Sequence, residues 1–361
     1  MGQRIVILFS MYKLITKIFL FSVLVLISCS KSEDSLINPD GITDHEITSH
    51  SNNRVSSLLM TKSEYKDWVN NDEFRNSEKR KSLTNDLYKK YADKYDFIFF
   101  ILNEPSIPEN LSYYGMLVGV SNNIQGTGQE IYDYSLDYGS NGKLKAVMQL
   151  TGLEYLRNGP ALHELAHNWA NFGIDTHYIN GPGTDITSFN YRPHWGFTGG
   201  SSRGQLGGFD QSTLVDNGNN SYTVNSFGGF ANGGNGIPFN ELELYMMGMI
   251  PSSQVSEFDV FTEITSFSSG SNKFNFTANS RKTYDAQVLE NLLGKRVPNS
   301  KNSQKNFKIL AVVITDTPLS DEEWNKVDAT AEWFSKKGED ESSLYNFWEA
   351  TNGIGSIDIE N

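Results

Sequence analysis

The sequence predicts an α+β fold. Residues 97–102 form an unbroken apolar run that stops before Pro105, which is typical of a buried strand. Residues 83–95 instead place Leu or Tyr at every fourth position of a charged segment, which is typical of an amphipathic helix. Helix, strands and a second helix follow one another without regular alternation, and this order favours an α+β architecture. The 361 residues suffice for one large domain or two smaller ones.

The first half of the chain contains one helix and three strands that the residue pattern indicates. The helix is expected over residues 78–95, and the strands over 96–102, 116–120 and 144–150. Residues 144–150 alternate between two kinds of side chain, so this strand should present two different faces.

A further helix is expected over residues 160–172. Pro160 suits a first helical position, and Gly173 suits the position just past a helix end. Within it, apolar residues form one stripe, whereas His163 and His167 fall outside that stripe with Glu164 beside them. A helix with this segregation can pack its back on a core and line a cleft with its two histidines.

The second half begins with a change of composition. Residues 173–240 are rich in Gly, Asn, Ser and Thr, and residues 214–224 predict a hairpin around an Asn-Gly turn. Asp216, Asn217 and Asn219 offer oxygen atoms for calcium, although their spacing does not match that of an EF-hand loop. Later elements are expected as helices over 241–248, 285–293, 321–336 and 342–351, and as a buried strand over 307–315.

Charge and cysteine content narrow the function. The net charge is −13 and no basic cluster stands out, so nucleic acid is not an expected partner. Cys29 is the only cysteine, which excludes an intrachain disulfide and a cysteine zinc site.

The N-terminal residues predict export. Residues 18–27 are a short apolar run behind Lys13 and Lys17, which is typical of a signal peptide. Residues 26–29 resemble a bacterial lipobox, which implies cleavage after residue 28 and lipidation of Cys29, with translation starting at Met1 or Met11. We therefore expect a signal peptide over 1–28, a flexible tether over 29–56 and a membrane-anchored lipoprotein at the surface of an outer membrane. His45 and His50 in the tether are spaced five apart and diverge on a helix, so they are given no metal role.

The segment His163-Glu-Leu-Ala-His167 carries the predicted chemistry. Two histidines four apart on a helix can bind one zinc ion, and Glu164 can act as the general base for a zinc-bound water. A catalytic zinc needs three protein ligands and an open position, so a third ligand must come from elsewhere.

This segment resembles the active-site helix of the zincin metallopeptidases. The resemblance implies a twisted mixed sheet packed on that helix, here over residues 57–173, and a C-terminal subdomain across a cleft, here 174–361. Ala170 and Gly173 stand where the metzincin branch has glycine and histidine, so the chain is not expected to be a metzincin.

The identity of the third ligand stays open. His194 lies in a Gly-rich loop with no apolar period, and it could be the third ligand or a hydrogen-bond donor to an oxyanion. Glu243 is the alternative, as in gluzincins, although Asn240 to Glu243 is also a capping-box pattern. The remaining candidates are Asp175, His177 and Asp185.

Taken together, these features predict a monomeric zinc metalloendopeptidase acting on extracellular protein or peptide. One catalytic Zn²⁺ is expected as the cofactor. The alternative is a surface lipoprotein without enzymatic activity that binds a glycan or a host protein on a zincin-like scaffold. Zinc hydrolysis of an amide other than a peptide is a third hypothesis, because water activation is common to both reactions.

Overall fold

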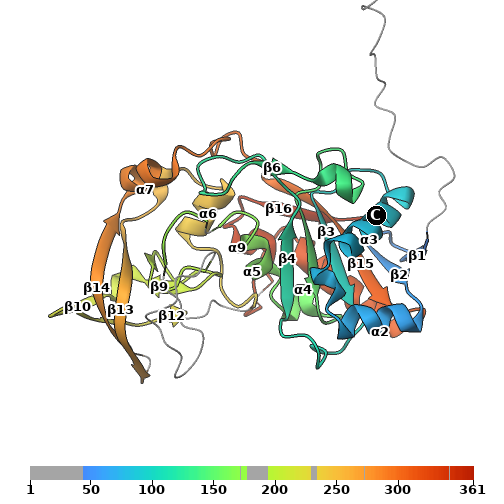
Figure 1. Ribbon diagram of the computed structural model, residues 1–361, viewed down its shortest axis with the longest axis horizontal. Helices are drawn as coiled ribbons and strands as arrows, with labels where there is room; N and C mark the ends of the chain where they lie inside the picture. The colour runs from blue at the N-terminus through green and yellow to red at the C-terminus, as the bar shows by residue number, and fades with distance from the viewer. Residues whose placement is uncertain (1–43, 171, 177–193, 229–233, 272, 341) are drawn as a thin grey trace, which may run out of the picture. The chain divides into compact units, whose positions relative to one another are not determined.

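Strands from both ends of the chain form one mixed sheet (Figure 1). The computed structural model describes residues 44–361 except 171, 177–193, 229–233, 272 and 341, and all of these lie in one unit spanning 36–361. The sheet order is β1 (Glu46–Ser49), β2 (Val55–Leu59), β15 (Asn306–Thr315), β3 (Phe97–Leu102), β7 (Ala146–Leu150) and β4 (Gly115–Gly119), with β16 (Ser356–Ile359) also pairing with β15. Strands β2, β15, β3 and β7 run parallel, whereas β1 and β4 are antiparallel edge strands.

The centre of the sheet is buried on both faces because its strands are largely apolar, and β3 is apolar throughout. Phe97, Phe99 and Ile101 of β3 belong to one core, and the alternate residues of β3 belong to the other. The first core contains residues of α5 (Ala161–Ala166), α6 (Glu241–Met247), α8 (Asp321–Ser335) and α9 (Phe347–Ala350). The second core contains residues of α2 (Lys62–Asn70) and α3 (Ser77–Lys90).

A separate aromatic core holds the second set of strands. The long hairpin of β13 (Phe258–Gly270) and β14 (Lys273–Tyr284) pairs with β11 (Ser221–Val224) and β10 (Val215–Gly218). The small sheet of β12 (Phe227–Gly228), β9 (Gly208–Asp210) and β8 (Gly199–Gly200) packs against it through Phe197 and Phe209. Shorter elements are β5 (Ser121–Asn122), β6 (Tyr132–Asp133), α4 (Tyr155–Asn158), α7 (Ala286–Leu293) and four 3₁₀ turns at Glu73–Arg75, Ser135–Tyr138, Gln211–Thr213 and Ser252–Gln254.

The α+β prediction is confirmed, and the predicted strands lie where the pattern placed them. The two faces of β7 differ as expected, although every residue of the strand is buried. Ala146, Met148 and Leu150 belong to the first core. Val147 belongs to the second core, and Gln149 on the same face hydrogen-bonds to side chains there. The hairpin at 214–224 forms, but its turn is at Asn219 and Asn220, which both have positive φ, and not at the Asn-Gly pair. Among the described residues no helix is long and apolar enough to cross a membrane.

The expected tether and the expected helix lengths need correction. Residues 46–49 and 55–59 are paired strands, so the chain is already folded well before residue 56. The sheet also takes β15 and β16 from beyond residue 173, the expected boundary between the two subdomains. The helix expected over 78–95 ends at Lys90, and the helix expected over 342–351 is reduced to Phe347–Ala350.

The helix that carries the histidines is also shorter than predicted. It ends at Ala166, because the amides of His167, Asn168 and Trp169 bond to carbonyls three residues back. This tighter winding is common at helix ends, and the apolar period continued through Trp169 without revealing it. His163 and His167 therefore lie in the last turn and at the C-cap of α5.

His45, which immediately precedes β1, bonds to side chains of α2 and α3. Its Nδ1 lies 2.8 Å from Asp86 Oδ2, and its Nε2 lies 2.9 Å from Glu64 Oε1. Burial lowers the pKa of His45, but the two carboxylates outweigh burial and leave that pKa raised. A raised folded-state pKa stabilises the fold below about pH 6.5, and that contribution is lost as pH rises through the folded value.

We expect His45→Ala to lower the free energy of unfolding by about 2 kcal/mol at pH 6 and by less at pH 9. The loss is larger at pH 6 because the substitution removes a protonated imidazole from the buried Asp86. Urea titrations at both pH values measure it, with exposed Thr48→Ala on the adjoining strand β1 as the control. An equal loss for His45→Ala at both pH values would contradict the charge argument.

Candidate functional site

A cavity of about 580 Å³ lies between the edge strand β4 and helix α5. Gly115, Met116 and Leu117 of β4 line one side of it. His163, Glu164, His167 and His194 line it too, so the cavity gathers the predicted catalytic residue and three of the predicted ligands.

The three histidines present ring nitrogens to one another. His167 Nε2 lies 3.1 Å from His163 Nε2, and His194 Nε2 lies 3.4 Å from the same atom. A tetrahedral site with zinc–nitrogen distances near 2.05 Å sets neighbouring ligand nitrogens roughly 3.3 Å apart. Within the described part of the chain, these three histidines are the one set of side chains whose ligand atoms lie close enough together to hold a metal ion.

One backbone carbonyl sets the tautomer of His163. Its Nδ1 lies 2.8 Å from the carbonyl oxygen of Gln205, which can only accept, so Nδ1 carries the proton. In the neutral ring the lone pair is then on Nε2, the nitrogen that faces His167 and His194. This orientation is the one that metal ligation requires.

The imidazoles are neutral at neutral pH. Burial lowers the pKa of His163 to about 4 and, with the neighbouring His163, lowers that of His194 to about 3. Burial and both neighbours also lower the pKa of His167. Protons therefore compete little with a metal ion for these nitrogens near pH 7. Three neutral imidazoles are a donor set that suits zinc.

Glu164 is held against the edge strand. Its side chain is 7% exposed and accepts a hydrogen bond from the backbone of Leu117 in β4. Burial raises the pKa of its carboxyl to about 8, which the Leu117 hydrogen bond only partly offsets. A nearby cation would favour the carboxylate and draw this pKa down. Such a group can take up and release a proton near neutral pH.

Glu243 lies outside the three-histidine cluster. The carboxylate is fully buried and accepts four hydrogen bonds, from Trp195 Nε1 and the backbone amides of Gln205, Leu206 and Asn240. It is the third residue of the capping box of α6, as the Asn240–Glu243 pattern allowed. The structure therefore brings His194, and not Glu243, to His163 and His167.

The other predicted residues are distributed as follows. Asp175 is exposed and is not part of the histidine group. His177, Asp185 and Cys29 lie outside the described residues. In the hairpin considered for calcium, Asp216 accepts a hydrogen bond from the Gly218 amide and pairs with Arg281 at 3.1 Å.

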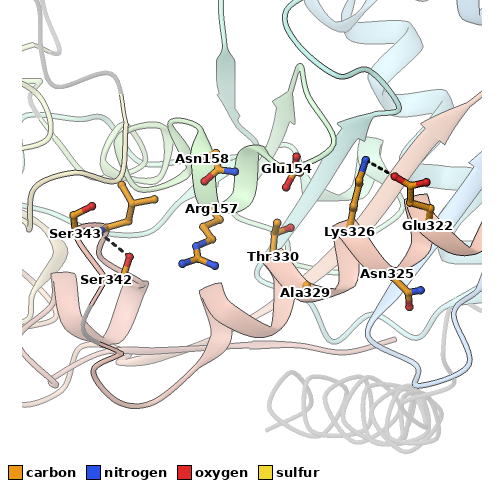
Figure 2. A pocket seen from close by; sticks show the side chains of 11 residues that line it. Glu154, Arg157, Asn158, Glu322, Asn325, Lys326, Ala329, Thr330, Ser342 and Ser343 are labelled. Atoms are coloured by element: carbon orange, nitrogen blue, oxygen red, sulfur yellow. Dashed lines mark hydrogen bonds and ion pairs between the residues drawn. The ribbon is translucent and has the colours of Figure 1, made fainter.

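A second cavity, of about 790 Å³, lies between α4, α8 and residues 342–344 (Figure 2). Its charged residues are two acids and two bases, namely Glu154, Glu322, Arg157 and Lys326. Lys326 forms an ion pair with Glu322 at 2.9 Å, which a dashed line marks in Figure 2. With balanced charge and no histidine in its lining, this cavity is not the candidate catalytic site.

The sequence did not indicate several residues of the site. Gly115 is one, because a Cβ there would lie 2.7 Å from Glu164 Cγ, so only glycine allows this close approach. Tyr132 and Gln129 also line the cavity, and they hydrogen-bond to each other at 3.2 Å. The Gln205 carbonyl could not have been found either, since backbone contacts between distant segments leave no residue signature.

Comparison with known proteins gives no relative. No family model, no curated protein and no solved structure matches the chain.

Proposed function

We propose that the protein is a zinc-dependent metallopeptidase. The observation that carries the proposal is the convergence of three neutral histidine nitrogens beside a buried glutamate in one cavity. His163, His167 and His194 would hold the metal. When bound, zinc would lower the pKa of a coordinated water and polarise the carbonyl of the substrate.

Glu164 is the proposed general base. Its carboxylate would accept the proton of the attacking water and then deliver it to the amine that leaves. Its place beside the cluster is set by α5 on one side and by the Leu117 amide on the other.

The free edge of β4 supports a peptide substrate over other amides. Among the described strands β4 pairs only with β7, and its residues 115–117 line the cavity. An extended peptide can add to such an edge through main-chain hydrogen bonds. A peptide docked there would pass beside Glu164, which lines the same cavity as residues 115–117.

The zincin-like architecture belongs to the same proposal. A mixed sheet packs on α5 through the core that contains Phe97, Leu162 and Leu165, and the antiparallel edge strand β4 lies beside α5. Attachment to an outer membrane through Cys29 and an extracellular protein or peptide substrate are proposed on the sequence alone.

The main test combines metal analysis with a peptide library. We expect one zinc per purified chain and cleavage that stops on chelation and returns with zinc. Stoichiometric zinc without cleavage of any peptide would instead favour the alternative, a surface protein that binds a glycan or another protein. Binding that survives chelation would support that alternative directly.

Gly115→Ala should impair catalysis without removing the metal. The new methyl group would lie 2.7 Å from the Cγ atoms of Glu164 and Pro160, so both side chains must shift to make room. A displacement of about 1 Å can cost roughly 100-fold in rate. We therefore expect kcat to fall about 100-fold with the zinc content unchanged.

The matched control is Gly236→Ala, because a Cβ at this exposed glycine would meet no atom within 4 Å. It should leave both kcat and zinc content unaltered. Full activity of Gly115→Ala would mean that Glu164 need not occupy the position seen here.

A further inference from the structure

We infer that Glu243 is a positioning residue that holds two of the three histidines in place for the metal. This inference rests on the proposed metal site, and it gives Glu243 a function other than ligation. The evidence is the position of the four N–H groups that donate hydrogen bonds to its carboxylate.

The first connection leads to His163. Oε2 accepts from the Gln205 amide at 3.1 Å and Oε1 accepts from the Leu206 amide at 2.7 Å, so two successive amides point at one carboxylate. The carbonyl of Gln205 then accepts the Nδ1 proton of His163 at 2.8 Å. Glu243 thus orients the peptide that orients His163.

The second connection leads to His194. Oε1 also accepts from the indole of Trp195 at 3.1 Å, and Trp195 directly follows His194. The Trp195 amide donates to the Leu206 carbonyl at 2.9 Å, which joins the two segments to each other. A single buried carboxylate therefore holds two segments in place. One contains the ligand His194 and Trp195, and the other contains Gln205, whose carbonyl orients the ligand His163.

Neighbouring residues show how tightly the carboxylate is enclosed. Its exposed fraction is 0%, and a Cβ on Gly204 would lie 2.5 Å from both of its oxygens. The α6 capping box fixes its backbone end, since Glu243 accepts from the Asn240 amide at 3.0 Å and the Asn240 side chain accepts from the Glu243 amide. The side chain has little freedom to take another position.

Each carboxylate oxygen accepts two N–H groups, and this makes Glu243→Gln informative. In glutamine an NH₂ group replaces one of the two carboxylate oxygens. In either orientation this NH₂ group would face two N–H donors and could accept from neither, so two hydrogen bonds are lost although the side chain keeps its shape. Outer partners of metal ligands typically contribute 10- to 100-fold to metal affinity. We expect Glu243→Gln to weaken zinc binding, measured by chelator competition, about 10- to 100-fold.

Two further variants separate positioning from general stability. Gly204→Ala leaves Glu243 in place but pushes on its oxygens, and it should weaken zinc binding in the same direction. Glu323→Gln makes the same change at the third residue of the α8 capping box, and it should leave zinc affinity unchanged. If Glu243→Gln fails to fold, Gly204→Ala still tests the inference.

A readout without metal distinguishes this inference from the proposed function. Long-range ¹H–¹⁵N NMR of the metal-free protein should show His163 protonated on Nδ1, and Glu243→Gln should mix the two tautomers. Unchanged tautomer and unchanged zinc affinity in both Glu243→Gln and Gly204→Ala would overturn the inference. A wild-type protein that keeps the tautomer but binds no zinc would overturn the proposed function instead.

Discussion

Glu164→Gln should lower kcat/KM for peptide hydrolysis about 1,000-fold while the protein still binds one zinc per chain. The amide keeps the size of the side chain but cannot accept the proton of the attacking water. The residue also accepts a hydrogen bond from the Leu117 backbone, which the amide oxygen can still do, so the local structure should persist. Steady-state kinetics and elemental analysis on the same preparation measure the two quantities.

The control for this change is Glu154→Gln. Glu154 is exposed beside α4 and lines the other cavity, so its replacement should leave kcat/KM unaltered. Activity of Glu164→Gln within tenfold of the wild type would remove Glu164 as the general base. Loss of zinc together with activity would leave the role of Glu164 unresolved between ligand support and proton transfer, and the Gly115→Ala variant would then decide it.

The elements that the sequence predicted are those whose signal is local. β3 was predictable because all six of its residues are apolar, as a strand buried on both faces requires. The caps of α6 and α8 were predictable because Asn240 and Ser320 each precede a glutamate at the third helical position.

The sheet order was not predictable, because it depends on contacts between distant segments. β15 lies between β2 and β3 although more than 200 residues separate it from them in the chain. Nothing in the sequence of residues 306–315 indicates that β2 and β3 are its partners. The β13–β14 hairpin was missed for a different reason. Most residues in the solvent-exposed half of the hairpin are polar, so the alternation of apolar and polar residues that predicts a strand is weak there.

The residues of the site also divide into those that a local pattern predicted and those that depend on contacts between distant segments. His163, Glu164 and His167 lie within five residues, so their spacing alone indicated shared chemistry. The choice between His194 and Glu243 could not be made from spacing, because His194 lies within the Gly-rich segment 173–240 and Glu243 directly follows it. The structure separates them through their partners, since Glu243 faces four N–H donors whereas His194 Nε2 faces His163 Nε2.

His194→Ala should reduce zinc affinity more than 100-fold, beyond the effect expected for an outer partner such as Glu243. The reason is that it removes one of the three nitrogens that converge, and two histidines alone do not complete a catalytic zinc site. Chelator competition measures the affinity, and circular dichroism checks that the fold is kept. His50→Ala, at a histidine outside the cluster, should bind zinc as the wild type does.

The same variant separates the two roles that His194 could have. If His194 donates a hydrogen bond to an oxyanion instead of binding the metal, His194→Ala would keep its zinc and lose about 100- to 1,000-fold in kcat. If it is a ligand, zinc and activity are lost together, and added zinc restores both in part. The 3.4 Å separation from His163 Nε2 fits the spacing of two ligands on one ion, so we expect the second result.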